Sequence, residues 1–115
     1  MKNLKNRVQL IGNIGKDPQI KSFDSGKTMA SFSLATSDSY TGKDGKRVED
    51  TQWHQVVAWG STANYVESYL EKGNRIAVEG RLVHRSYNDK DGTTKYITEV
   101  MVNEILLLTN KSVAV

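Results

Sequence analysis

The sequence predicts a small all-β protein with one short helix, and three observations lead to this class. Five segments alternate between apolar and polar residues with the two-residue period of a β-strand. One helical segment stands between the third and the fourth of them, and glycines lie inside strand patterns, as the bends of a small closed barrel require. The order β-β-β-α-β-β predicts a five-stranded Greek-key barrel of the OB type, with an SH3-like barrel as the main competitor.

The first two strands are separated by turn residues. "RVQLIGNIG" from Arg7 alternates, and "KDP" at residues 16–18 closes it. After the turn "FDSGKT" at residues 23–28, "MASFSLATS" alternates apolar residues with serines and small residues. These two segments predict strands with one apolar face each.

The third strand carries both tryptophans of the chain. Residues 37–50, "SDSYTGKDGKRVED", are polar, contain glycines and predict a loop or a flexible hairpin tip. The strand "TQWHQVVAWG" follows at residues 51–60. Its two tryptophans are six positions apart and therefore share one face of the strand.

The helix is predicted directly after the tryptophan strand. Ser61 is a plausible N-cap, and Ala63, Val66 and Leu70 fall at i, i+3 and i+7 of an amphipathic helix. Gly73 stands where a helix commonly ends in a left-handed glycine.

Two more strands complete the predicted barrel. "NRIAVEGRLVHR" from Asn74 alternates, and Gly80 inside it indicates a bulge or a sharp bend. Asp91 and Gly92 form the strongest turn signal in the chain and predict a hairpin. The last strand is expected at residues 96–108, "YITEVMVNEILLL".

Composition excludes several classes of protein. The 115 residues suffice for one domain, and the absence of cysteine excludes disulfides and thiolate metal sites. Two histidines are too few for a histidine-built metal cluster, and no carboxylates have metal-ligand or catalytic spacing, so we expect no metal, no cofactor and no enzymatic activity. No apolar run approaches a membrane span or a signal peptide, which predicts a cytosolic protein. The formal charge of +3 permits polyanion binding without demanding it.

The tryptophans can be read as core residues or as binding platforms, and the strand pattern alone leaves both readings open. Trp53 and Trp59 lie on a face no less apolar than the opposite one, and large aromatics usually belong to a core. Two tyrosines shift the balance, because Tyr40 lies in the polar segment and Tyr87 lies among basic residues. Aromatic residues interleaved with cations are typical of surfaces that stack bases and neutralise phosphates.

The sequence closely resembles the bacterial-type single-stranded DNA-binding protein family. The motifs that carry the resemblance are "NRVQLIGNIGKDP", "FSLATSDSY", "TQWHQVVAWG", "YLEKGNRIAVEGRL" and "YITEVMVNEI", in register from about Lys5 to Leu108. The resemblance implies an OB-fold domain over residues 1–108. It further implies a homotetramer that wraps single-stranded DNA in replication, repair and recombination, without catalysis, in the cytoplasm at the nucleoid.

The resemblance also assigns roles to individual residues. Expected base-stacking residues are Tyr40, Trp53, Trp59 and Tyr87. Expected phosphate contacts are Lys43, Lys72 and Arg85, with Arg7, Arg81 and Lys95 as weaker candidates from the surface pattern. His54 is expected at a subunit contact, against the alternative of a hydrogen-bonded barrel histidine. Gln55 and Ser61 depart from the family, since many relatives have arginine and lysine there.

The end of the chain is a second departure from the family. Relatives usually continue through a flexible linker to a short acidic tip that recruits partner proteins, whereas residues 109–115 read "TNKSVAV". Tail-mediated protein partners are therefore not expected for this chain. The alternatives to the main hypothesis are a dimeric restart-type primosomal protein and an RNA-binding or protein-interaction OB module, since stacking does not read the 2′-hydroxyl.

Overall fold

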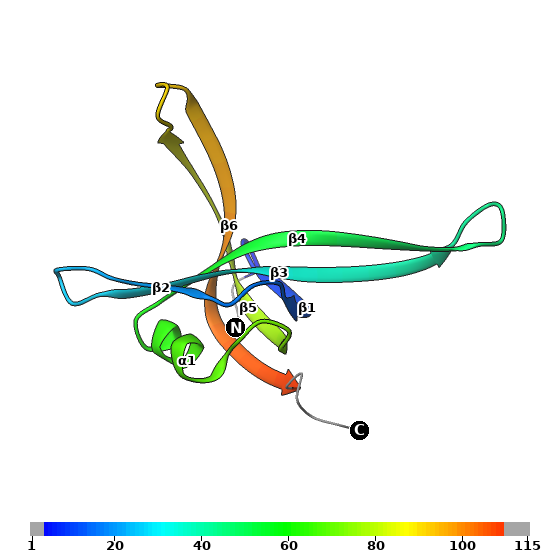
Figure 1. The fold of residues 1–115 in the computed structure, drawn as a ribbon, viewed down its shortest axis with the longest axis horizontal. Helices are drawn as coiled ribbons and strands as arrows, with labels where there is room; N and C mark the ends of the chain where they lie inside the picture. The colour runs from blue at the N-terminus through cyan, green and yellow to red at the C-terminus, as the bar shows by residue number, and fades with distance from the viewer. Residues whose placement is uncertain (1–3, 110–115) are drawn as a thin grey trace.

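The computed structural model describes residues 4–109, which form a closed barrel with protruding hairpin arms (Figure 1). The elements are β1 (Val8–Ile14), β2 (Gln19–Ser22), β3 (Thr28–Thr41), β4 (Arg47–Trp59), α1 (Ser61–Tyr69), β5 (Arg75–Asn88) and β6 (Thr94–Thr109). The strand order is β1-β5-β6-β4-β3-β2, and a further β1–β3 pairing closes a five-stranded ring. The predicted five-stranded barrel, with its helix after the tryptophan strand, is confirmed.

The sequence prediction missed β2, a sixth strand outside the ring. β2 pairs with the first residues of β3, and the turn between them matches the predicted one at residues 23–28. Its four residues, "QIKS", are too short to show a two-residue period convincingly. The predicted domain boundary at residue 108 falls in β6, and residues 110–115 of the expected C-terminal remnant lie outside the described residues.

The core lies inside the ring and beneath the helix. Buried residues from every ring strand and from α1 form one cluster: Ile14, Ala30, Phe32, Leu34, Val56, Ala58, Ala63, Val66, Leu70, Ile76, Val78, Val100 and Val102. At about 25 cal/mol per Å² of buried apolar surface, this cluster is the main stabilising element of the fold. In the described part of the chain, no helix is both long and apolar enough to cross a membrane.

The helix forms where it was expected, but both predicted end signals are wrong. Its N-cap is Gly60, whose φ of 61° turns the chain from β4 into α1, and no side chain caps the helix. The predicted apolar face is confirmed, because Ala63, Val66 and Leu70 are all buried. Gly73 lies in a turn beyond the helix end at Tyr69. The Gly73 N–H donates to the Ile14 carbonyl at 2.8 Å. Gly73 therefore anchors the turn to β1.

Of the two alternatives predicted for residues 37–50, the loop is wrong, because most of the segment is β-strand, whereas a hairpin tip is present at residues 42–46. β3 and β4 stay paired from Met29 opposite Trp59 out to Thr41 opposite Arg47, and only residues 42–46 form the turn. The arm projects from the barrel along the long axis of the molecule (Figure 1). Backbone pairing sustains this ribbon without a core, so neither face shows the apolar period that predicts strands.

The second arm is formed by the outer halves of β5 and β6. The predicted bulge at Gly80 is confirmed, because the β5–β6 register shifts between Glu79 and Gly80. A Cβ atom at Gly80 would collide with the Met101 carbonyl, so this close approach of two strands requires glycine. Gly92, with φ 82°, closes the predicted hairpin at its tip.

The two arms explain the size of the molecule. Its radius of gyration is 16.4 Å and its longest extent is 54 Å. A compact domain of this length has a radius of gyration of about 13 Å. The chain therefore exposes long polar ribbons that its own core does not cover.

Candidate nucleic-acid interface

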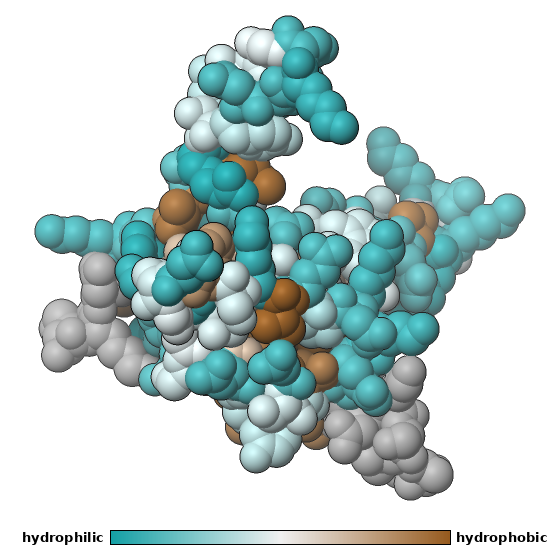
Figure 2. Space-filling view, turned by 60° about the vertical axis from the view of Figure 1, so that its left-hand side comes forward, coloured by the Kyte–Doolittle hydropathy of each residue, from teal (hydrophilic) through white to brown (hydrophobic). Residues whose placement is uncertain are grey.

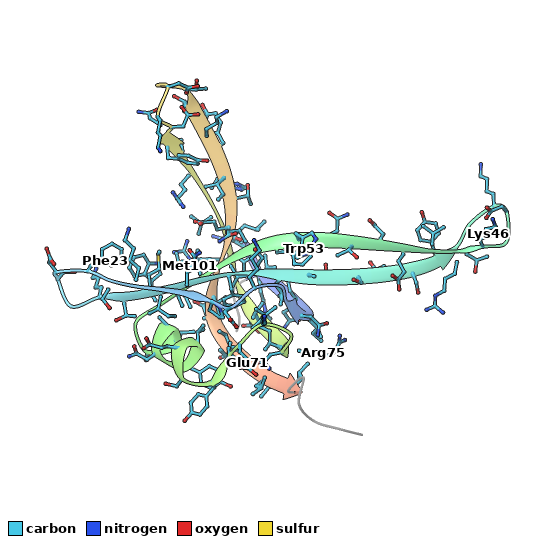
Figure 3. All side chains as sticks on the ribbon, viewed as in Figure 1. Phe23, Lys46, Trp53, Glu71, Arg75 and Met101 are labelled. Atoms are coloured by element: carbon cyan, nitrogen blue, oxygen red, sulfur yellow. The ribbon has the colours of Figure 1, made fainter. Side chains whose placement is uncertain are left out.

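The outer face of the sheet brings most of the predicted site residues together. On β4 the core-facing positions hold His54, Val56 and Ala58, so the alternating positions of Trp53 and Trp59 face outward. β6 runs parallel to β4 with Glu99 beside Gln55, and β5 continues the sheet on the far side of β6. By the same alternation this outer face also carries Arg81, Arg85, Tyr87 and Lys95. Figure 3 shows Phe23, Met101, Trp53 and Lys46 spread along the long axis of the molecule.

Trp53 is exposed and lies against a glycine. Its side chain is 62% exposed, although it belongs to the central strand of the sheet. A Cβ atom at Gly15 would lie 2.5 Å from Cζ3 of the Trp53 ring. Gly15, Lys16, Ser33 and Trp53 line a shallow hollow of about 310 Å³. The six-membered ring of the indole thus lies against the backbone of Gly15.

Trp59 is less exposed because another aromatic ring covers part of it. Phe23, in the turn between β2 and β3, stacks on Trp59 with 5.7 Å between ring centroids and 24° between ring planes. Trp59 keeps 38% of its surface exposed, next to a hollow of about 410 Å³. The reading of both tryptophans as core residues is therefore excluded for the isolated chain.

Tyr87 lies on the β5–β6 arm. It is 47% exposed and stands directly opposite Lys95 in the register. The Lys95 ammonium is 3.8 Å from a carboxylate oxygen of Asp89. An aromatic ring and a cation thus occur side by side on the outer face of this arm.

Tyr40 belongs to the β3–β4 arm, opposite Val48, and not to a loop. Its ring is 58% exposed, and the same arm offers a hollow lined by Ser39, Thr41 and Arg47. Tyr40 is five positions from Ala35, which pairs with Trp53, and an odd separation places it on the opposite face of the ribbon. Of the four expected stacking residues, Tyr40 alone lies on that other face.

Arg85 does not stand free, because Glu99 binds it. The Arg85 Nε and Nη2 atoms donate to the two Glu99 carboxylate oxygens at 2.9 and 3.1 Å. The carboxylate is only 7% exposed, whereas Arg85 is 53% exposed. These hydrogen bonds, together with the charge of Glu99, raise the pKa of Arg85 above its ordinary value. The exposed side of the guanidinium remains open to a phosphate, but Glu99 already balances its charge.

The other predicted cations are scattered around the barrel. Lys43 lies in the turn of the β3–β4 arm, and the backbone N–H of Lys72, between α1 and β5, donates to Asp17 Oδ1 at 2.9 Å. Arg7 is mostly covered and pairs with Glu79 at 2.8 Å. Arg81 is exposed near Arg7 and faces outward on β5. Arg7 is thus the predicted phosphate contact that the structure makes least available.

His54 lies on the barrel side of β4, half-buried. Its Nε2 atom is 2.8 Å from the Thr36 Oγ1 atom across the β3–β4 pair. This contact matches the alternative of a hydrogen-bonded barrel histidine. It leaves the expected subunit contact as a prediction.

Sequence reasoning missed several residues of this surface. They are Gly15 beneath Trp53, Phe23 and Lys21 at the Trp59 end, and Glu99 beneath Arg85. A signal existed for Glu99, because the predicted hairpin at Asp91 and Gly92 makes it a diagonal cross-strand neighbour of Arg85. Nothing in the local sequence connects Phe23 with Trp59. The face seen in Figure 2 is mostly hydrophilic, and its hydrophobic residues appear as separate patches.

Comparisons with known proteins agree with the resemblance seen in the sequence. The family model described as "Single-strand binding protein family" matches residues 5–108. The single-stranded DNA-binding protein of Bacteroides thetaiotaomicron is 44% identical over 108 residues, covering 92% of this chain and 67% of that protein. Single-stranded DNA-binding protein 1 of Xylella fastidiosa is 43% identical over 107 residues, covering 92% of this chain and 79% of that protein. Single-stranded DNA-binding protein 1 of Chlorobaculum tepidum is 41% identical over 104 residues, covering 90% of this chain and 64% of that protein.

Solved structures have the same fold. The Plasmodium falciparum SSB in its complex with ssDNA superposes with a TM-score of 0.83 at 29% identity, covering 95% of this chain and 99% of that chain. A deletion mutant of the single-stranded DNA binding protein from Thermus aquaticus gives a TM-score of 0.78 at 33% identity, covering 92% of this chain and 51% of that chain. The family match over almost the whole chain, with these identities, is decisive: the chain belongs to the single-strand binding protein family.

Proposed function

We propose that this chain binds single-stranded DNA without regard to sequence, by stacking bases on exposed aromatic rings and neutralising phosphates with nearby cations. The observation that carries the proposal is the exposure of Trp53, at 62%, on the outer face of a central strand. A large indole in that position costs solubility and adds nothing to the core, whereas every base offers a π-face to it. Family membership supports single-stranded DNA as the ligand.

The stacking surface has a definite composition. Trp53, Trp59 and Tyr87 share the outer face, and Tyr40 adds a ring on the other face of the β3–β4 arm. Each base stacked on such a ring contributes roughly 1 to 3 kcal/mol, measured by alanine substitution. DNA that contacts all four rings must pass around the arm, which fits a protein that wraps its ligand.

Phosphate neutralisation is the second part of the proposal. Lys43, Lys72, Arg81 and Lys95 are the exposed candidates, and Arg85 contributes through the side that Glu99 leaves open. If four phosphates are neutralised per subunit, the logarithm of the affinity falls with the logarithm of salt concentration with a slope of about −2.8. Alanine at one of these cations is expected to make that slope shallower by about 0.7.

We further propose that the chain assembles into a homotetramer. Ile11 is 54% exposed and Leu106 is 61% exposed on the outer face of β1, β5 and β6, away from the tryptophans. These side chains line a hollow of about 460 Å³ with Ala77 and the aliphatic neighbours Leu10 and Ile105. A second copy that covers this face would remove the apolar surface from water. His54 is proposed to lie near a subunit contact as well.

Mass measurement tests the assembly. Sedimentation equilibrium is expected to give the mass of four chains. Leu106→Lys would bury an unpaired charge at the contact and is expected to give assemblies of lower mass, whose chains remain folded. A dimer would favour the restart-type alternative. A monomeric wild-type protein would contradict the assembly altogether.

Fluorescence titration tests the function. Tryptophan emission is followed while a thymidine oligonucleotide, the matching uridine oligonucleotide and a duplex are added at several salt concentrations. Strong quenching by the DNA strand, and little by the duplex, is the expected result. Preference for the RNA strand would favour an RNA-binding module, and the absence of quenching by any strand would overturn base stacking.

The remaining assignments follow from this function. Proteins of the family are non-enzymatic DNA-binding proteins, and this chain is proposed to have no catalytic activity of its own. Residues 1–108 are proposed to be the DNA-binding domain. Its place of action is proposed to be the cytoplasm at the nucleoid, where replication, repair and recombination expose unpaired strands.

A further inference from the structure

The Trp59 ring is stacked against a residue from a different hairpin. The Phe23 and Trp59 centroids are 5.7 Å apart and their planes differ by 24°, the offset geometry that aromatic pairs prefer. Both rings stay more than one third exposed, so this pair is not part of the core. Its position on the surface indicates a role other than stabilising the barrel.

The β2–β3 turn holds Phe23 in place. The Phe23 N–H donates to the Lys27 carbonyl, and its own carbonyl accepts from the Gly26 N–H, both at 2.9 Å. Gly26 has φ 88°, a conformation that other residues adopt only with strain. At the other end of the contact, the Gly60 N–H donates to the Thr28 carbonyl at 3.0 Å. The two rings are therefore tied to one another through short stretches of ordered backbone.

The uncovered part of Trp59 borders a hollow with one cation. Lys27, Trp59, Gly60 and Ser61 line a space of about 410 Å³, within the range of about 300 to 1,000 Å³ common for small-ligand clefts. Of the described residues that line it, Lys27 alone carries a charge. Lys21 places a second ammonium 5.3 Å from the centroid of the Phe23 ring. Cations and stacked rings thus meet on the β2–β3 hairpin. The sequence analysis predicts a turn there but no binding residue.

From this geometry we infer that Phe23 is a positioning residue for Trp59, and that Lys27 contacts the phosphate of the nucleotide stacked there. The inference rests on the proposed binding of single-stranded DNA and extends its path onto the β2–β3 hairpin. Phe23 restricts the indole to an orientation with one open face, so less conformational freedom is lost when a base binds. Lys27 supplies the charge that uncharged Ser61 cannot supply at the same hollow.

The first experiment isolates the Trp59 signal. In a Trp53→Phe background Trp59 is the remaining tryptophan, and its emission anisotropy and its quenching by a thymidine oligonucleotide are recorded. Phe23→Leu is expected to lower the anisotropy of the free protein and to weaken binding about 2- to 10-fold, as loss of an aromatic pair implies. Phe23→Tyr keeps the ring and is expected to behave as the parent. Tyr69→Leu removes an exposed aromatic from α1 and serves as the matched control.

A double variant separates positioning from a direct contact. If Phe23 acts through Trp59, Phe23→Leu has no further effect on binding once Trp59 is leucine. An equal loss in the presence and absence of Trp59 would overturn the positioning role. Unchanged anisotropy and unchanged affinity in Phe23→Leu would overturn it too.

The second experiment counts the phosphate contact. Lys27→Ala is expected to make the salt slope of DNA binding shallower by about 0.7 per subunit. Lys21→Ala removes the same charge from the same hairpin, but its ammonium lies at the Phe23 ring and not at the hollow, so its slope is expected to change less. Equal slopes for Lys27→Ala and the wild type would overturn the contact, as would a larger change for Lys21→Ala.

Failure of this inference is distinguishable from failure of the proposed function. If the wild-type protein binds the oligonucleotide and the Phe23 and Lys27 variants match it, only the inference is overturned. If the wild-type protein shows no quenching, the proposed function is overturned and the inference with it.

Discussion

Adding one methyl group beneath Trp53 is predicted to weaken DNA binding while leaving the fold intact. In Gly15→Ala the new Cβ atom would start 2.5 Å from Cζ3 and 2.9 Å from Cη2 of the indole. Carbon atoms in ordinary contact are about 3.5 to 4.0 Å apart, so the ring edge has to move by about 1 Å. Trp53 is 62% exposed and has room to move, so we expect a change in unfolding free energy within about 0.5 kcal/mol.

The expected loss of affinity follows from the size of that displacement. A gap of roughly 0.5 to 1 Å forfeits a quarter to a half of a contact well. Applied to a stacked base worth roughly 1 to 3 kcal/mol, this loss amounts to about 0.3 to 1.5 kcal/mol. Binding per subunit should therefore weaken about 2- to 10-fold.

The assay is a fluorescence titration with a thymidine oligonucleotide, accompanied by chemical denaturation. Gly12→Ala is the structural contrast, because its Cβ would collide with the backbone carbonyl of Ala35, which cannot swing away. That variant should lose stability by about 1 to 3 kcal/mol or more. The reasoning is refuted if Gly15→Ala binds DNA like the wild type, or if it weakens binding equally when Trp53 is already alanine.

Three further predictions concern the arms and the ion pair. Arg85→Ala leaves the Glu99 carboxylate buried without the Arg85 donors, and it should lower the unfolding free energy by about 1 to 3 kcal/mol in urea titrations. The Arg85→Leu, Glu99→Leu double variant removes both charges and should recover most of the lost stability. Asp50→Ser removes a like charge directly opposite Asp38 and should stabilise the arm by about 0.2 to 1 kcal/mol, a gain in thermal melts that shrinks with added salt. Tyr40→Ala should reduce DNA affinity by up to one stacked base, roughly 1 to 3 kcal/mol in titrations, without lowering the melting temperature. Unchanged stability in Arg85→Ala, a gain for Asp50→Ser that salt does not reduce, or unchanged DNA affinity in Tyr40→Ala would contradict these arguments in turn.

The sequence predicts elements well where a core imposes a period. The barrel strands and the apolar face of α1 bury alternate or helically spaced residues, and these were predicted at nearly their observed positions. The Gly80 bulge was predictable for a related reason, since a glycine that interrupts an apolar strand marks a close backbone approach. Burial is the physical signal that such patterns record.

The features that escaped prediction are those that burial does not govern. The sequence of residues 37–50 predicts only a loop or a hairpin tip because both faces of the outer β3–β4 arm meet water, although the backbone stays paired along most of it. The N-cap is Gly60 and not the predicted Ser61, because the chain has to turn sharply out of β4 and Gly60 adopts a φ of 61° there. The Phe23–Trp59 contact joins residues 36 positions apart, and only the tertiary fold brings them together.

The turn at residues 42–46 closes the far end of the β3–β4 arm. The Gly42 N–H donates to the Lys46 carbonyl at 2.8 Å, Asp44 Oδ1 accepts from the Lys46 N–H at 3.0 Å, and Gly45 adopts φ 80°. The register of this ribbon is set at its base, where Phe32 pairs with Val56 and Leu34 with His54 in the barrel. Because Tyr40 lies on the strand that leaves the barrel, its distance in sequence from Leu34 fixes the face of its ring, and the turn only joins the two strands at the far end. The turn can therefore change in length without reversing the Tyr40 ring, so the reach of the arm could vary while the route of a bound strand is kept.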